Sequence, residues 1–204
     1  KDENIEFNFA GYQGSGVLVN DEWQYVGQSN QMLIKTENGD VVIDTMDVDM
    51  TVSASIVEML SSGFYDSDTT FNIRSISFED KDKTADSRVV ANNLYIKANS
   101  KINTEKNTGN VGITYGLDAF TMADFKAEDL ALAIEINNLS KDFIDAYQEN
   151  INELSQGSQS ETEAKLMQFI ETHLLSLVKA EPELNITSLR GTFAQGSFDS
   201  AINT

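Results

Sequence analysis

Few residues in this sequence have the chemistry of a catalytic or metal-binding group. The 204 residues include one histidine, His173, and no cysteine. A Ser-His-Asp triad or a histidine-bound metal would have to use that single side chain, and a zinc site with two histidines cannot form. His173 belongs to an apolar stripe with Leu174 and Leu177, so we interpret it as a structural residue. The lack of cysteine excludes disulfides, thiolate metal ligands and cysteine nucleophiles.

Carboxylates are abundant, but their spacing matches no common site. Five aspartates fall within one stretch of the chain: Asp44, Asp47, Asp49, Asp66 and Asp68. Calcium needs six to eight oxygens from a loop that wraps the ion, and the EF-hand spacing is absent, so a weak cation site stays open. A carboxylate pair for glycoside hydrolysis has 33 acidic residues to draw on, but nothing in the sequence selects two of them. We interpret the single tryptophan, Trp23, as a partial core anchor.

The only glycine cluster is Gly11-Tyr12-Gln13-Gly14-Ser15-Gly16. It does not match a phosphate-binding loop, because no lysine follows it and no helix is expected after it. We interpret it as a flexible connection between strands. The sequence therefore gives us no catalytic, cofactor-binding or metal-binding residue to assign.

The charge balance excludes two classes of partner. Asp and Glu number 33 against 14 Lys and Arg, which gives a formal net charge of −19. Nucleic acids and anionic membrane surfaces both need a basic patch, and none is present. No apolar run is long enough to span a bilayer. The chain begins Lys1-Asp2-Glu3 without a signal sequence, so we interpret it as a mature form or an excised fragment.

Alternating apolar and polar residues predict long antiparallel strands before residue 140. The clearest runs are 5–9, 46–53, 71–78, 90–98, 111–117 and 130–136. Ile76 and Phe78 have the opposite parity to Phe71 and Ile73, which predicts a bulge near Arg74. The scarcity of proline fits uninterrupted ladders.

Turn signals separate these runs and indicate a meander. Asn38-Gly39 is typical of a type I′ hairpin, and 107–110 and 79–86 are two further expected turns. The stretch 55–63 stays open between a short helix and the end of a strand.

After residue 139 the apolar spacing changes to three or four residues, which predicts two antiparallel amphipathic helices. Ser140 is the expected N-cap of the first helix. A break is expected at 157–159, and Ser160 with Glu163 forms a capping box for the second helix. Pro182, the only proline, follows as a stop, and strands return at 184–187 and 192–198.

We therefore predict one α+β domain over 1–204. It has mainly antiparallel strands over 1–139, a helical pair over 140–180 and returning strands over 184–204. Because both the strands and the helices have one apolar side, the helical pair is expected to pack on the apolar face of the long-stranded meander sheet. A chain of this length typically buries roughly 70% of the surface that its unfolded form exposes.

The order of these features resembles the YdgA-like family of bacterial envelope proteins, a domain of unknown function. The resemblance depends on residues 71–78, on 110–120 with Ile113-Thr114-Tyr115-Gly116-Leu117, on 129–139, on the helix 143–154 and on 184–198. It implies a periplasmic location and an inner-membrane anchor upstream of this chain. The family has no established catalytic residues, so the resemblance adds none.

Two functions remain as hypotheses, and an enzyme is the less favoured third. The first is a non-catalytic envelope module that acts through protein contacts or as a structural element, with a filled core between helices and sheet. The alternative is a carrier for lipid or another apolar ligand, held in a groove between sheet and helices. Five methionines could line such a groove or form ordinary core: Met46, Met50, Met59, Met122 and Met167.

Overall fold

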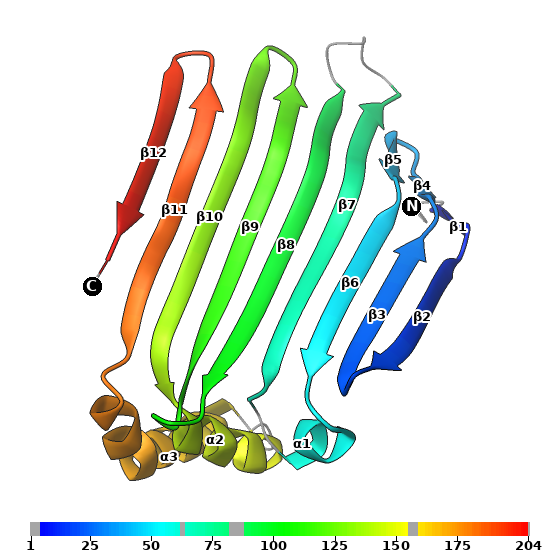
Figure 1. Cartoon of the computed structure of the whole chain (residues 1–204). Coiled ribbons are helices and arrows are strands. Elements are labelled where there is room, and N and C mark those ends of the chain that lie inside the picture. Colours follow the sequence, from blue (N-terminus) through cyan, green and yellow to red (C-terminus); the bar gives the residue numbers. More distant parts are fainter. Residues whose placement is uncertain (1–4, 62–63, 82–87, 155–158, 204) are drawn as a thin grey trace.

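Twelve antiparallel strands form one open sheet in the computed structural model, and the helices gather at one end of it (Figure 1). The structure describes residues 5–61, 64–81, 88–154 and 159–203. The strands are β1 Glu6–Phe9, β2 Tyr12–Val19, β3 Glu22–Ser29, β4 Met32–Lys35, β5 Gly39–Ile43, β6 Met46–Ser53, β7 Asp66–Asp80, β8 Val89–Asn103, β9 Thr108–Met122, β10 Phe125–Ser140, β11 Glu183–Phe193 and β12 Gly196–Ile202. The helices are α1 Ile56–Ser61, α2 Lys141–Leu154 and α3 Gln159–Lys179.

The sheet is a meander once the segments β1–β2, β3–β4 and β5–β6 are each taken as one long strand that is interrupted in its middle, since β1 pairs with β4, β3 with β6 and β5 with β7. β7 to β12 follow one another directly, and the two helices α2 and α3 are inserted between β10 and β11. On its other side β7 is shared by two strands, since β6 pairs with Asp66–Ile73 and β5 pairs with Ile76–Asp80. The predicted antiparallel meander with α+β content is confirmed.

A line of irregular positions, which we call the transverse break, crosses the middle of the sheet. Ladder pairs are missing at 10–11, 30–31, 44–45, 74, 93, 118 and 129. The pairing register is nevertheless the same on both sides, as Ile73↔Leu94 and Ile76↔Ala91 show for β7 and β8. The irregularity predicted near Arg74 is present. It is not an extra residue in one strand, because Asn93 on the facing strand leaves the ladder too, at φ 53°.

The transverse break reverses the alternation of side chains along a strand. In β7 the apolar positions are odd before the break and even after it, as in Ile73 and Ile76. In β10 they are even from Leu130 onward, whereas Ala127 before the break is odd. Because successive strand residues point to opposite faces, this reversal keeps the apolar residues of both halves on one face of the sheet.

The predicted packing of α2 and α3 on the apolar face of the sheet is not confirmed. Figure 1 shows both helices at the end of the strands, where α2 continues directly from β10. The predicted cap is present, because Ser140 Oγ accepts a hydrogen bond from the Phe143 backbone N–H at 3.3 Å. The helices pack on each other through Phe169, which is 7% exposed and lies against Phe143 and Tyr147.

The molecule therefore exposes much more surface than a compact chain of its size. Its accessible surface is 13440 Å², whereas a compact monomer of 22.6 kDa exposes about 9,500 Å². By the same scaling the chain buries about 60% of its unfolded surface rather than the expected 70%. Buried apolar residues are few among the described residues: Val52, Ala54, Phe64, Ala127, Ala131 and Phe169. The filled core expected between helices and sheet is absent from this part of the chain.

Local structure at the turns differs in part from the sequence expectations. The hairpin at Asn38-Gly39 exists, but Thr36 Oγ1 holds its loop by accepting the Gly39 N–H, and neither Asn38 nor Gly39 has a positive φ. The two-residue turn with positive φ at both positions is Asn20-Asp21. The strand character predicted over 192–198 is present at 192–193 and 196–198, but the turn of the β11–β12 hairpin at 194–195 divides it.

The stretch left open at 55–63 forms the short helix α1, which begins with a capping box. Glu58 accepts the Ser55 backbone N–H at 2.8 Å, and Ser55 Oγ accepts the Glu58 N–H at 3.2 Å. The backbone hydrogen bond from Ser55 lowers the pKa of Glu58.

The glycine cluster is not a flexible connection. Gly14 and Gly16 lie inside β2, and a Cβ on Gly14 would collide with the Tyr25 ring. A Cβ on Gly27 of β3 would collide with Tyr12 in the same way. The missing side chains let the two tyrosines lie flat across the strands, where their hydroxyls share a hydrogen bond that raises the pKa of Tyr12.

Some predictions concern residues outside the described part of the chain. Residues 157–158 of the predicted break and the side chain of Ser160 belong there, as does most of the turn at 79–86, whereas residue 159 already begins α3. Of the helices in the described ranges, none is both long enough and apolar enough to cross a membrane.

Candidate functional site

The apolar face of the sheet carries a shallow groove of about 310 Å³ across β8 to β12. Its floor is aliphatic and its rim includes two aromatic side chains. The residues that line it are Leu94, Tyr115, Gly116, Leu117, Leu130, Ala131, Leu132, Leu189, Arg190 and Phe198. The groove lies at the low end of the size range of small-molecule sites.

Strand pairing brings the leucines together from four strands. Leu94 pairs with Leu117, Leu117 pairs with Leu130, and on the next row Leu132 pairs with Leu189. Each is held on this side of the sheet by the regular alternation of its strand on the helix side of the transverse break. Because no helix covers them, these side chains form a surface rather than a core.

Aromatic residues extend the apolar face beyond the transverse break. Phe120 lies 6.0 Å from Phe125, Phe125 lies 6.1 Å from Phe193, and Phe193 stacks on Phe198 at 6.1 Å between ring centroids. A Cβ on Gly191 would meet Leu130, Phe198 and Phe193. Residues from both sides of the break therefore share one face, as the reversed alternation requires.

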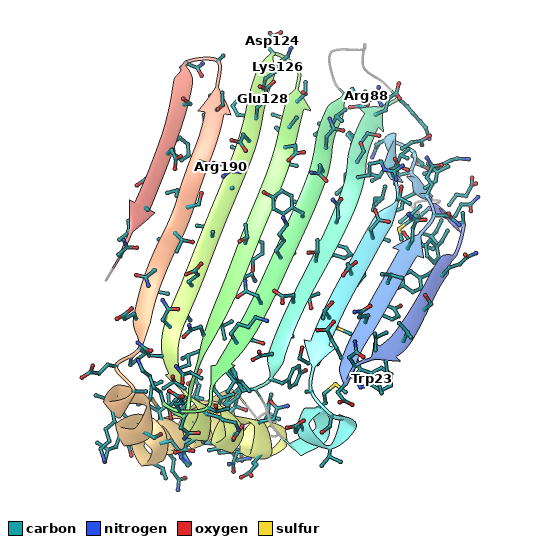
Figure 2. The ribbon with its side chains drawn as sticks, in the orientation of Figure 1. Trp23, Arg88, Asp124, Lys126, Glu128 and Arg190 are labelled. Atoms are coloured by element: carbon teal, nitrogen blue, oxygen red, sulfur yellow. The ribbon has the colours of Figure 1, made fainter. Side chains whose placement is uncertain are left out.

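One residue that lines the groove, Arg190, forms an ion pair. Arg190 Nη2 is 3.0 Å from Asp129 Oδ1, and their side chains are 40% and 64% exposed. Asp129 is a transverse-break position with φ 50°. Figure 2 shows Arg190 in the upper part of the sheet, below Glu128 and the hairpin-end residues Asp124 and Lys126.

The opposite face of the sheet is polar. Gln28 donates to Asp47 at 2.7 Å, and a chain of amides runs along the break, where Asn72 donates to Asn93 and Asn93 donates to Asp118. A depression of about 530 Å³ on this face includes Gln13, Gln28, Asp47 and Asn72 in its lining. Most of the residues that line it are polar, whereas those of the leucine groove are mostly aliphatic, so we do not select it for an apolar ligand.

A third depression, of about 670 Å³, lies between the β2–β3 hairpin and α1. Its lining includes Trp23, which Figure 2 shows at the helix end of the sheet. Trp23 is half-buried there, opposite Leu18 and Val52 in the ladder. This position agrees with our interpretation of Trp23 as an anchor.

The residues weighed from the sequence do not come together at one place. His173 lies on α3 with its ring 4.6 Å from that of Phe169, a structural position. Asp47 and Asp49 lie on the polar side of β6, whereas Asp44 is beside Arg74 at the break. Within the described ranges, no three or more metal-binding side chains come close enough to hold an ion.

The sequence analysis missed the leucines of the groove as a site because it expected helices to cover them. The signal that could have found them is the parity reversal itself. In β7 the reversal predicts one continuous apolar face, and the same reversal recurs in β8, where Ala91 and Leu94 flank Asn93, and in β9. A sheet that carries such a face along fifteen-residue strands is too wide for two helices of this length to cover.

Comparisons with known proteins identify a family and no function. A family model described as "Bacterial protein of unknown function (DUF945)" matches residues 1–204, the whole chain. No curated protein and no solved structure matches the chain.

Proposed function

The chain belongs to the bacterial family of unknown function DUF945. We propose that it is a non-catalytic module of the cell envelope that binds the acyl chain of a lipid on the open face of its sheet. The observation that carries the proposal is the groove of Leu94, Leu117 and Leu189, whose lining no other part of the described chain covers. The YdgA-like resemblance supports the bacterial envelope, and the periplasm within it, as the place of action.

The chemistry of the groove supports a hydrocarbon ligand. Of the described residues that line it, none is a carboxylate or an imidazole, and the one cation, Arg190, is already paired with Asp129. Burial of each methylene group there contributes about 0.8 kcal/mol, independent of direction, so a flexible chain can bind without polar contacts. The same lining offers no general acid or base, which supports a non-enzymatic role.

The net charge of the protein predicts which lipid headgroups it can bind near. A chain of charge −19 repels an anionic headgroup held near its surface. We therefore expect the ligand to be a lipid without net charge, such as a zwitterionic phospholipid. The upstream inner-membrane anchor implied by the resemblance would hold the module close to such lipids.

Leu189→Glu tests this function. Leu189 is 37% exposed in the groove, so the substitution should destabilise the fold little. It places a charge where the acyl chain would lie. We expect at least a tenfold loss of affinity for a fluorescent zwitterionic lysophospholipid, which corresponds to about 1.4 kcal/mol. Fluorescence titration of the purified protein below the micelle concentration measures it.

The matched control is Leu175→Glu, the same change at a residue of α3 that is 64% exposed and outside the groove. It should bind the probe as the wild type does. Equal binding by Leu189→Glu and the wild type, or no copurified lipid in native mass spectra of the wild-type protein, would contradict the proposal.

The first hypothesis, a module that acts through protein contacts, is favoured by a different feature. The margins of the sheet end in strands whose outward side has no partner in the described chain. That feature is independent of the groove.

A further inference from the structure

Within the described residues, the outer side of β2 has no paired strand from Tyr12 to Val19. β2 pairs with β3 from Tyr12 to Val19 and with no other described strand. Figure 1 places it at one margin of the sheet, with β12 at the other. The outward N–H and C=O groups of such a strand form a template for another strand unless the protein blocks them.

β2 has none of the features that usually block an edge. It contains no proline, no lysine and no other charged residue. Val17, Leu18 and Val19 are 53%, 50% and 41% exposed. By contrast, the edge strand β12 carries Asp199 at its centre, and β1 carries Glu6, which pairs with Lys35 at 3.1 Å. In a chain of charge −19, β2 is therefore an unusually neutral and apolar edge.

We propose that β2 pairs antiparallel with β2 of a second copy of this chain, about a two-fold axis at Ser15. The distribution of charge favours a second copy of the chain as the partner of β2. Two chains of charge −19 can approach only where no acids face each other, and the eight residues of β2 meet that condition.

The faces of the sheet fix the register. An axis perpendicular to the sheet keeps each face on its own side, so facing residues must have the same parity. A two-fold axis at Ser15 places Tyr12 of each copy opposite Leu18 of the other copy. Tyr12 and Leu18 are each about half exposed, and both lie on the apolar side of the sheet. Centring on Gly16 would instead place Leu18 opposite Gly14 and Tyr12 opposite the turn residue Asn20. The first register gives two aromatic–aliphatic cross-strand pairs and is the one we propose.

The dimer is expected to be weak and to strengthen with salt. Eight residues a side form an interface smaller than the standard size, so association depends on concentration. Since both copies are acidic outside β2, screening of their repulsion favours pairing. A basic partner at this strand would show the opposite salt dependence.

Disulfide trapping tests the register directly, because the natural chain has no cysteine. In Ser15→Cys the two sulfurs would face each other across a ladder whose Cα spacing is within the range of disulfides. We expect oxidation to give a covalent dimer at least tenfold faster than for Ser200→Cys, the same substitution on the edge strand β12. Equal rates for both variants would overturn the proposal.

Sedimentation of the wild-type protein at low and high salt gives the second readout. We expect the dimer fraction to rise with salt and with protein concentration, and Leu18→Lys to abolish it while circular dichroism stays unchanged. A wild-type chain that is monomeric at every salt and protein concentration would overturn the proposal, as would a dimer that Leu18→Lys leaves intact. Neither result depends on lipid, so the lipid-binding function is tested separately.

Discussion

At the scale of single residues, the contact between Gly109 and Phe64 shows how closely packed the helix end of the sheet is. Phe64 is 6% exposed and its ring lies directly on Gly109 at the start of β9. A Cβ on Gly109 would collide with the ring. Since Phe64 follows α1 and Gly109 follows the β8–β9 turn, this contact connects segments that the sequence does not relate.

Gly109→Ala should therefore destabilise the protein by about 1–3 kcal/mol, because the added methyl group forces the Phe64 ring or the strand to move. Gly16→Ala is the matched control, since a Cβ there meets its nearest atoms at 3.6 Å, an ordinary contact. Urea unfolding of both variants measures the difference. Equal stabilities would show that the ring moves aside freely.

At the scale of the strands, the transverse break is stabilised by its own side chains. Asn93 has φ 53°, accepts a hydrogen bond from Asn72 at 2.5 Å and donates one to Asp118 at 2.7 Å. Asparagine tolerates this backbone conformation better than most residues, and its amide can both donate and accept. Asn93 thus joins three strands where the ladder itself is missing.

We expect Asn93→Val to cost about 2–4 kcal/mol, from backbone strain at positive φ and from the lost hydrogen bonds. Asn93→Gly loses the same hydrogen bonds but relieves the strain, so it should be at least about 1 kcal/mol less destabilising than the valine variant. Chemical denaturation of the pair separates the two causes. If the variants unfold alike, backbone conformation at the break carries no strain.

The long strands β7 to β10, both long helices and the cap at Ser140 follow from sequence patterns because each depends on neighbouring residues. The strands β2 and β3 do not, since the glycines of β2 have no apolar alternation. The irregularity near Arg74 was predicted from the change of parity alone. The matching irregularities at Asn93, Asp118 and Asp129 were not predicted, because polar residues at these positions resemble ordinary solvent-facing residues. The placement of the helices was not predictable in this way. An amphipathic stripe indicates that one face of a helix is buried against another element, but it does not identify that element.

At the scale of the whole molecule, the exposed sheet face has a thermodynamic signature. Unfolding exposes less new surface than in a compact protein of 22.6 kDa, because 13440 Å² is exposed already. The denaturant dependence of the unfolding free energy scales with that newly exposed surface.

We therefore expect an m-value about one sixth lower than that of compact proteins of the same length, measured by guanidinium unfolding of delipidated protein at low salt and low concentration. Addition of the zwitterionic lysophospholipid should raise the unfolding midpoint, since a ligand that binds only the folded state stabilises it. A full-sized m-value in the absence of lipid would mean that the face is covered in solution.

The meander topology has one more consequence. The pairs β1–β2, β3–β4 and β5–β6 are each divided by the transverse break, and each can be taken as one long strand. Every ladder then joins long strands that are consecutive in the chain, apart from the inserted helical pair, so each strand is stabilised by its immediate neighbours as in a stack of repeats. No distant segment closes the structure. The central strands β8 to β10 are then held from two sides and the marginal ones from one, so opening would begin at the margins and move inward. A molecule organised in this way can gain or lose strands at its borders while its middle keeps its form.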